Sequence, residues 1–86
     1  MNFWLKTVSR EKITRDKVAR NALPLNMQNS LEVLRDICHE LDLPSPVFTK
    51  YHFDNLEKFN FVKFRPEDFV DAVDFDYMSV ENFYDK

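Results

Sequence analysis

Apolar and polar residues alternate with two different periods along this chain, and the clearer period is helical. Five apolar residues, spaced three or four apart, share one stripe: Leu31, Leu34, Ile37, Cys38 and Leu41. Asn29 is a residue type that caps helix N-termini, and Glu32 follows three positions later, as in a capping box. Pro44 ends the helix near Asp42. The pattern therefore predicts an amphipathic helix over residues 30–41.

Two segments before this helix have the composition of strands. Phe3–Val8 is rich in aromatic and β-branched residues. Residues 12–20 fit a second strand after a turn at 9–11, but Ile13 and Val18 then fall on opposite faces unless the strand contains a bulge. As a helix, the same residues would gain two favourable charge pairs four positions apart. We predict the strand and keep the helix as the alternative.

The second half of the chain mixes strand patterns with short helical signals. Strands are predicted at 47–51, 59–64 and 73–84. Phe53, Leu56 and Phe59 recur at every third position, which indicates a helical turn or a packed loop. Pro66 suits the first position of a short helix, from which Phe69 would turn inward.

Together these elements predict an α+β fold. A small antiparallel sheet, built from the N-terminal hairpin and the later strands, would carry one main amphipathic helix on one face. The chain has 86 residues, of which 44% are hydrophobic, so it can bury one core but not two. We therefore predict a single compact domain over residues 1–86.

Several cellular contexts are disfavoured by the same sequence. No apolar run approaches the ~18 residues of a membrane span, and the first residues lack the apolar region of a signal peptide. A single cysteine excludes an internal disulfide framework and is compatible with a reducing compartment. These features predict a cytoplasmic protein with no membrane partner.

The absence of glycine narrows the chemistry further. Phosphate-binding loops of the P-loop and dinucleotide type, and the calcium loop of an EF-hand, all need glycine at fixed positions. The chain contains no glycine at all, so these loops are excluded. Turns and helix ends must be made with other residues.

Charge is distributed unevenly along the chain, although its formal net value is only −3. Residues 1–20 carry six basic groups and two acids, whereas residues 66–86 carry seven acids and one base, Lys86. The two ends can attract each other, so the simplest interpretation is cross-strand pairing within the fold. The alternative is that the acidic segment serves a partner.

Two carboxylates are the strongest candidates for catalysis or metal binding. Asp74 and Asp76 are two positions apart, so in a strand both would project from one face. With Glu67 or Asp71 they could hold a hard cation or act as an acid and base pair. However, catalytic carboxylate pairs of the glycosidase type need a sugar-binding cleft, which a domain of this size rarely forms. No metal site, cofactor or catalytic residue is therefore predicted.

Cysteine and histidine do not form a recognisable site either. Cys38 and His39 are neighbours on the predicted helix and would point about 100° apart. His52 belongs to a different segment, and one cysteine with two histidines cannot supply four zinc ligands. Cys38 is predicted to be a small core residue.

Aromatic residues offer a route to nucleic-acid binding. Five of them fall on or beside predicted strands: Trp4, Tyr51, Phe61, Phe64 and Tyr77. On a sheet they could stack unpaired bases, but only Lys50, Lys63 and Arg65 are near enough to contact phosphates. The acidic C-terminal segment opposes phosphate binding. Any such binding would rely mostly on the basic N-terminal strands.

Three segments carry a resemblance to a known family. They are Ile37–Phe48, Phe64–Phe69 and Val73–Met78, the last of which contains the sequence F-D-Y. They resemble a helix-to-strand segment, an acidic turn and the start of a last strand in small uncharacterised proteins of about this length from clostridia and related Gram-positive bacteria. The resemblance implies a β-hairpin, a helix and further strands. That family has no assigned activity, so no functional residue is carried over.

We predict a non-enzymatic protein–protein interaction module with a regulatory or inhibitory role. The predicted partner-binding residues are the acids Glu67, Asp68, Asp71, Asp74 and Asp76. A row of carboxylates can mimic a phosphate backbone, as in phage-type inhibitors, by analogy of size and charge. The second hypothesis is a small nucleic-acid-binding protein that uses the basic N-terminal strands, and the third is a metal-dependent enzyme. The sequence does not define an oligomeric state.

Overall fold

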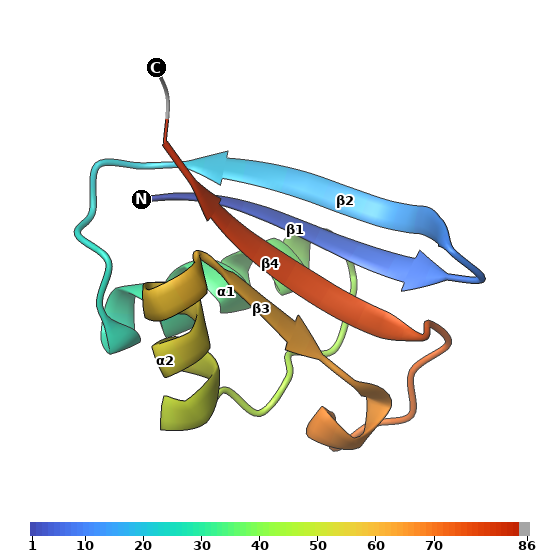
Figure 1. Ribbon diagram of the computed structural model, residues 1–86. Helices are drawn as coiled ribbons and strands as arrows, with labels where there is room; N and C mark the ends of the chain where they lie inside the picture. The colour runs from blue at the N-terminus through green and yellow to red at the C-terminus, as the bar shows by residue number, and fades with distance from the viewer. Residues whose placement is uncertain (85–86) are drawn as a thin grey trace.

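The computed structural model describes residues 1–84. Its elements are β1 (Asn2–Ser9), β2 (Lys12–Arg20), α1 (Met27–Glu40), α2 (Lys50–Phe59), β3 (Phe61–Phe64), the 3₁₀ helix η1 (Pro66–Asp68) and β4 (Tyr77–Phe83). The strands form one antiparallel sheet in the order β2-β1-β4-β3, and both α-helices cover the same face of it (Figure 1). The predicted α+β class is confirmed, with a second helix where the sequence predicts only a helical turn or a packed loop.

The core fills the space between this sheet and its two helices. Its main side chains are each 2% exposed or less: Phe3 and Leu5 of β1, Val62 and Phe64 of β3, Met78 and Val80 of β4, Leu34 and Ile37 of α1, and Leu56 of α2. On each strand these residues alternate with residues of the other face, as the two-residue period of a strand requires. That other face of the sheet carries no helix (Figure 1).

The N-terminal hairpin settles the alternative for residues 12–20 in favour of a strand. Thr7 pairs with Arg15 but Val8 pairs with Ile13, so Thr14 is an extra residue in β2 and forms the predicted bulge. Because Val18 pairs with Trp4, the bulge brings Ile13 and Val18 to the same face. The bulge is also held by a 2.7 Å hydrogen bond between the hydroxyl groups of Thr7 and Thr14.

The turn of this hairpin adopts a backbone conformation that normally calls for glycine. Arg10 and Glu11 have φ angles of 52° and 66°, and together they connect Ser9 to its strand partner Lys12. Two consecutive left-handed residues are typical of a type I′ turn, which favours Asn-Gly. Left-handed geometry costs a residue with a side chain about 1–2 kcal/mol. The backbone of the turn is therefore strained, and substitution by residues that favour left-handed φ angles should relieve the strain.

We expect the double substitution Arg10→Asn and Glu11→Gly to stabilise the protein. The gain should be about 1 kcal/mol, or about 4–8 °C in melting temperature for a domain of this size. Thermal unfolding followed by circular dichroism measures it. Lys12→Gly is the matched control, because Lys12 lies in β2 and glycine in a strand should lower the melting temperature. An unchanged or lower melting temperature for the double variant would contradict strain at the turn.

Helix α1 begins earlier than predicted. Its N-cap is Asn26, whose side chain accepts a 2.8 Å hydrogen bond from the backbone N–H of Asn29. The prediction that Asn29 is the cap is therefore wrong, because the earlier of the two asparagines satisfies the first free N–H groups. The predicted end is confirmed, since Leu41 is the C-cap and Asp42 follows with a φ angle of 56°.

The predicted strand at 47–51 is wrong, because helix α2 begins inside it. Thr49 is the N-cap of α2, and its side chain accepts a hydrogen bond from the backbone N–H of His52. The helix then runs to Phe59, and Asn60 ends it with a left-handed φ angle of 55°. The three-residue spacing of Phe53, Leu56 and Phe59 therefore belongs to a full helix.

The last two strands are shorter than predicted. Strand β3 starts at Phe61, because Asn60 still belongs to the end of α2. Strand β4 starts at Tyr77 instead of Val73, and the residues before it form a loop. The short helix at Pro66 is confirmed as η1, and Phe69 is buried as predicted.

Among residues 1–84, no helix has the length and apolar character that crossing a bilayer requires.

Candidate functional site

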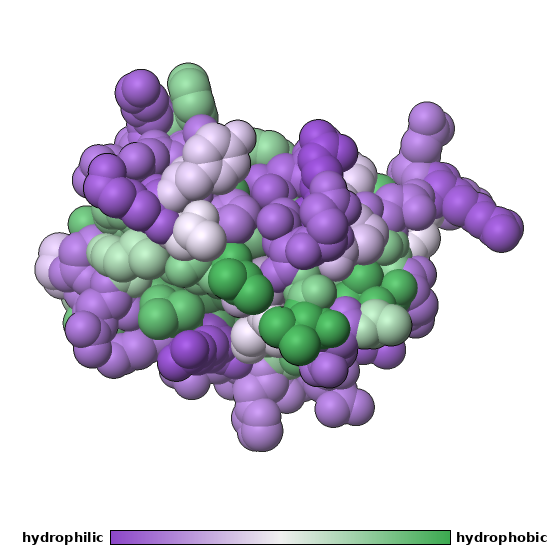
Figure 2. Space-filling view, turned by 90° about the horizontal axis from the view of Figure 1, so that it is seen from below, coloured by the Kyte–Doolittle hydropathy of each residue, from purple (hydrophilic) through white to green (hydrophobic). Residues whose placement is uncertain are grey.

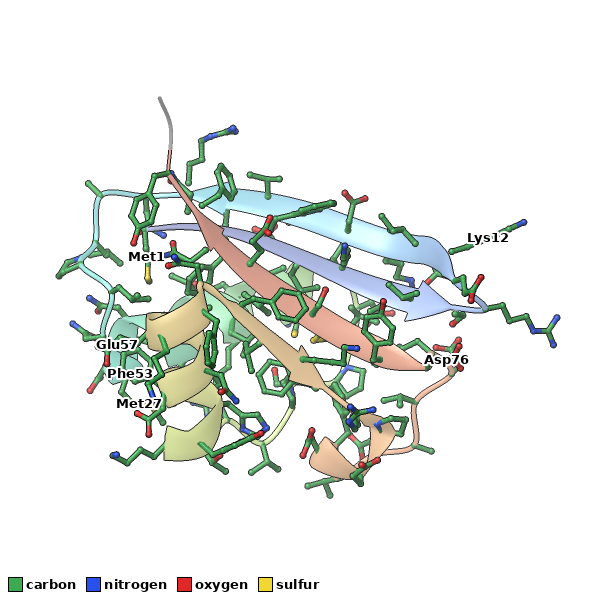
Figure 3. All side chains as sticks on the ribbon, viewed as in Figure 1. Met1, Lys12, Met27, Phe53, Glu57 and Asp76 are labelled. Atoms are coloured by element: carbon green, nitrogen blue, oxygen red, sulfur yellow. The ribbon has the colours of Figure 1, made fainter. Side chains whose placement is uncertain are left out.

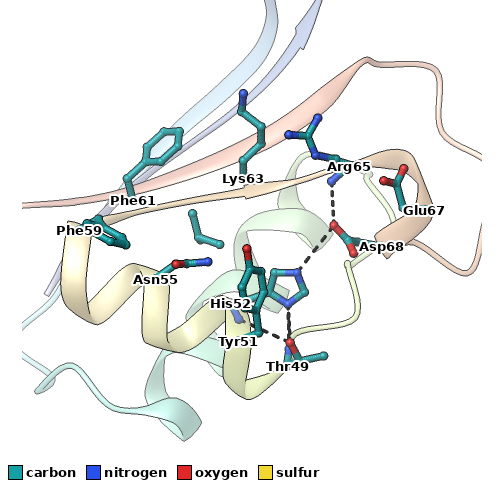
Figure 4. A pocket seen from close by; sticks show the side chains of 11 residues that line it. Thr49, Tyr51, His52, Asn55, Phe59, Phe61, Lys63, Arg65, Glu67 and Asp68 are labelled. Carbon is teal, nitrogen blue, oxygen red and sulfur yellow. Dashed lines mark hydrogen bonds and ion pairs between the residues drawn. The ribbon is translucent and has the colours of Figure 1, made fainter.

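A groove runs between helix α2 and strand β3, and η1 closes one end of it (Figure 4). Its volume is about 650 Å³, which is in the range of small-ligand and peptide pockets. We call it the α2–β3 groove. Its main lining residues are Tyr51, Asn55 and Phe59 of α2, Phe61 and Lys63 of β3, Arg65, and Glu67 and Asp68 of η1.

Three aromatic side chains of the groove are exposed to solvent. Tyr51 is 71% exposed, Phe59 67% and Phe61 39%. Tyr51, Asn55 and Phe59 are four residues apart on α2, so they form one stripe toward β3. The core stripe of the same helix is formed by His52 and Leu56 instead, which are both buried. The exposed aromatic stripe therefore is not needed to build the core.

This stripe is not predicted by the sequence pattern when residues 47–51 and 53–59 are interpreted as separate elements. Tyr51 was placed on a strand, so its spacing from Asn55 and Phe59 carried no meaning. The available signal was Thr49, a good N-cap residue, followed by ten residues without proline or glycine. A continuous helix from Lys50 would have shown two stripes, one for the core and one left over.

His52 connects the start of α2 to η1 at the base of the groove. Its Nδ1 accepts a 3.0 Å hydrogen bond from the backbone N–H of Thr49 and lies 2.9 Å from the Thr49 hydroxyl. Because Nδ1 accepts, the proton of the neutral ring is on Nε2, which lies 3.7 Å from Oδ2 of Asp68. The ring also packs against that of Phe64, with centroids 4.6 Å apart and the planes tilted by 36°.

Thr49, His52 and Asp68 have the residue types of a nucleophile, a base and a carboxylate, but their geometry is that of a helix cap. The Thr49 oxygen and His52 exchange hydrogen bonds within a capping box at the first turn of α2. The distance from Nε2 to Asp68 is longer than a hydrogen bond. Thr49 and His52 therefore cap α2, and with Asp68 they shape the closed end of the groove.

Both signs of charge line the groove. Glu67 is exposed and Asp68 half-buried at the η1 end, where the Asp68 carboxylate accepts a 2.9 Å hydrogen bond from the Arg65 backbone N–H. Lys63 and Arg65 line the β3 side (Figure 4). The Lys63 ammonium lies 4.3 Å from the ring centroid of Tyr77, so β3 carries its positive charge toward the helix-free face.

The structure separates the five acids predicted to bind a partner. Only Glu67 and Asp68 line the α2–β3 groove. Asp71 and Asp74 are exposed in the loop between η1 and β4. Asp76 accepts a 2.8 Å hydrogen bond from the Arg10 backbone N–H and lies beside the hairpin turn (Figure 3).

Asp74 and Asp76 do not share a strand face, because both precede the start of β4. The geometric premise of a carboxylate pair on one strand is therefore wrong. Within residues 1–84, no three histidine, cysteine or acidic side chains lie close enough to hold a metal ion together. Asp85 and Lys86, the last acid and the one base of the acidic segment, lie outside the described residues.

The basic groups of the hairpin are divided between the two faces of the sheet. Arg15 and Lys17 lie on the side of the helices, where Arg15 donates to the Leu41 carbonyl and Lys17 forms a 2.6 Å ion pair with Glu40. Lys6 belongs to the opposite face, where its ammonium lies 4.5 Å from the ring centroid of Trp4. The basic residues therefore do not form one continuous patch.

The helix-free face of the sheet combines aromatic rings with both signs of charge. Residues that are directly opposite each other on β2, β1, β4 and β3 form rows across this face. One row is Val18, Trp4, Glu81 and Phe61, and the next is Asp16, Lys6, Ser79 and Lys63. The Trp4 indole N–H donates a 3.0 Å hydrogen bond to Asp16. Lys6 covers Trp4 and Lys63 covers Tyr77, so two of its rings are already occupied by cations of the chain.

On the helix side of the molecule, apolar side chains form an interrupted band in a largely hydrophilic surface (Figure 2). Val70, two residues after η1, is 90% exposed. Val47, which is 50% exposed, donates its backbone N–H to the Asp68 carbonyl. Exposed apolar residues therefore flank η1 and continue beyond the closed end of the α2–β3 groove.

Cys38 is a core residue, as predicted, and is completely buried in α1. Burial raises the pKa of its thiol from 9.0 to about 11, against a smaller lowering by a hydrogen bond with Ser45. His39, its neighbour, is exposed on the opposite side of the stripe. The two side chains therefore do not form a joint site.

Comparison with known proteins found no matching family model, no similar curated protein and no similar solved structure. The resemblance to the clostridial family accordingly stays a prediction. The site has to be interpreted from its own geometry.

Proposed function

We propose that this protein is a non-enzymatic cytoplasmic interaction module that binds a partner protein through the α2–β3 groove. The observation that carries the proposal is the set of three exposed aromatic residues, Tyr51, Phe59 and Phe61, around one concave surface. Aromatic side chains are enriched at protein interfaces, where burial of a ring contributes most to affinity. Leaving them in water at both walls of a groove is unfavourable unless a partner covers them.

Two of the five predicted acidic residues support the same proposal. Glu67 and Asp68 lie at the closed end of the groove, so part of the predicted acidic surface is adjacent to the aromatic surface. Charges at the rim of an interface act mainly on association rate and specificity. A regulatory or inhibitory role for the module would use these acids to select the partner.

Nucleic-acid binding through the hairpin remains the second hypothesis, and the structure favours it less. Such binding needs a continuous basic surface. Arg15 and Lys17 are instead engaged with α1, and on the helix-free face the acidic Asp16 lies directly opposite Lys6. The aromatic rings of the helix-free face are the one feature that favours nucleic-acid binding. The crosslinking experiment below therefore also distinguishes an RNA adduct from a protein adduct.

We expect site-specific photocrosslinking in living cells to capture one protein from the groove. A benzoylphenylalanine at Phe59 or Phe61 should give a single dominant protein adduct, because both side chains line the groove. The same probe at Val18, on the far edge of the sheet, should not. Excess wild-type protein should compete for the adduct at least tenfold better than Tyr51→Ala/Phe59→Ala.

Three outcomes of this experiment would contradict the proposal. One is equal capture from Val18 and from the groove positions, and another is competition by the double variant as good as by wild type. The third is an adduct that is RNA instead of protein, which would support the second hypothesis. Tyr51 and Phe59 are mostly exposed, so the double variant should keep its fold, and its circular dichroism melt checks this.

A further inference from the structure

Strand β3 is an edge strand, and its hydrogen-bond pattern shows which backbone groups face outward. The register pairs Phe61 with Glu81 and therefore Asn60 with Asn82. The Asn82 N–H donates to the Asn60 carbonyl at 2.8 Å, so this opposed pair is a hydrogen-bonded pair. Such pairs alternate in an antiparallel ladder, which makes Val62 the next residue bonded to β4.

It follows that the N–H and C=O groups of Phe61 and Lys63 point away from β4, toward the free edge of the sheet. The next residue with this orientation, Arg65, is already used, because its N–H and C=O are bonded to Asp68. The free edge thus offers two donors and two acceptors, spaced as in a strand. The α2–β3 groove lies directly beside them (Figure 4).

The other edge of the sheet is protected in a way that β3 is not. Five of the nine residues of β2 are charged: Lys12, Arg15, Asp16, Lys17 and Arg20. Charged side chains along an edge strand oppose pairing with another chain. Strand β3 carries one charge, Lys63, in four residues and has a helix-lined groove next to its edge.

We propose that the partner binds as an extended segment that adds a fifth strand to the free edge of β3. The inference rests on the proposed function and specifies how that site works. Strand addition pairs the main chain of a peptide with a sheet edge, while alternate side chains enter a neighbouring pocket. Here the main chain would pair with Phe61 and Lys63, and the side chain opposite Val62 would enter the groove between Tyr51 and Phe59.

Charge and polarity around the edge define the chemistry of the segment. The residue opposite Lys63 is acidic, since Lys63 and the neighbouring Arg65 are the cations of this edge. The residue opposite Phe61 is apolar, because directly opposed side chains on one face are in contact. The two lie two positions apart, with an apolar residue between them that contacts the aromatic stripe of α2.

The test selects peptides from a random displayed library of about ten residues on the immobilised full chain, a length sufficient for one strand. The expected consensus contains an acidic and an apolar residue two positions apart. Selection on Lys63→Glu should replace the acidic residue by a basic one at the same position. Peptides from the wild-type selection should bind Tyr51→Ala/Phe59→Ala at least tenfold more weakly, and Val18→Ala within twofold of wild type.

Backbone pairing is tested on a synthetic copy of the selected peptide. Methylation of single backbone nitrogens should lower affinity at every second position only, as strand pairing requires and helical docking does not. Hydrogen exchange should show new protection of the Phe61 and Lys63 amides in the complex. The amides of Val62 and Phe64, already bonded to β4, serve as the internal reference.

Several results would overturn strand addition. They are the absence of any enriched peptide, a methylation scan without alternation, and new protection on β2 instead of β3. A dimer of the chain that already protects Phe61 and Lys63 without peptide would show that the occupant is a second copy. Crosslinking from the groove can still capture a partner protein when the peptide and exchange experiments contradict strand addition. In that case the proposed interaction function stands, and only the proposed binding mode is wrong.

Discussion

Phe64→Ala is expected to destabilise the protein by about 3–5 kcal/mol, a large part of the 5–15 kcal/mol typical of a domain. The Phe64 side chain is 0% exposed, and its ring packs against His52 and lies 6.1 Å from that of Phe48. Truncation would leave a cavity where β3 meets the start of α2. Equilibrium unfolding in urea measures the loss as a lower midpoint, or as a protein that is unfolded without denaturant.

Phe61→Ala is the matched control, because it removes the same side chain from the same strand on the other face. Phe61 is 39% exposed, so its loss should cost less than about 1 kcal/mol. The same variant should weaken partner capture, since Phe61 lines the α2–β3 groove. Equal destabilisation by the two substitutions would contradict the assignment of core and helix-free faces on β3.

The predicted fold was correct where the pattern of apolar residues was long enough to define a period. The stripe containing Leu34, Ile37 and Cys38 gave the main helix, and these residues are buried as a periodic face requires. The boundary was wrong because Asn26 and Asn29 are equally good caps. Only the packed structure shows that Asn26 caps α1 and that Asn29 donates to the Pro24 carbonyl.

Short segments were ambiguous for a physical reason. Residues 47–51 contain valine, phenylalanine, threonine and tyrosine, which favour strands by propensity. The capping interaction of Thr49 with His52 outweighs that preference and starts α2. A capping box with histidine at its third helical position is not part of the usual sequence signature, so the start could not be recognised from residue types alone.

The sequence predicts which kinds of residue the candidate site contains, but not how these residues are arranged in space. The sequence pointed to acids, of which Glu67 and Asp68 lie at the groove and Asp76 anchors the hairpin turn. It also identified Tyr51 and Phe61 as aromatic candidates, but for stacking bases on a sheet. Their actual arrangement depends on how α2 packs against the edge of β3, a contact between neighbouring elements that no local spacing encodes.

A comparison of the helix-free face with the edge of the sheet is the reason why we propose binding at the edge. On the helix-free face, the rings of Trp4 and Tyr77 are covered by Lys6 and Lys63 within the fold itself. At the edge of β3, the rings of Tyr51 and Phe59 remain uncovered next to free backbone donors and acceptors. A partner would therefore gain more buried aromatic surface and more hydrogen bonds at the edge than on the face.

Wild-type protein is expected to lose about 2–3 kcal/mol of stability between pH 9 and pH 11 through Cys38 alone. Burial raises the pKa of the Cys38 thiol from 9.0 to about 11, so the folded state keeps the proton that the unfolded state releases above pH 9. The contribution is fully present below pH 9 and is lost as the pH rises through 11. Urea unfolding midpoints at pH 8, 9, 10 and 11 measure this slope.

Cys38→Ala isolates this contribution from the other groups that ionise in the same range. The variant should be less stable at every pH, because it leaves a small cavity at a side chain that is 0% exposed. Its stability should nevertheless fall less steeply above pH 9, so the two curves should converge by about 2–3 kcal/mol at pH 11. Parallel curves, or rapid labelling of the native thiol by iodoacetamide at pH 8, would show that water reaches Cys38. In that case α1 would not be packed against the sheet as tightly as its buried stripe requires.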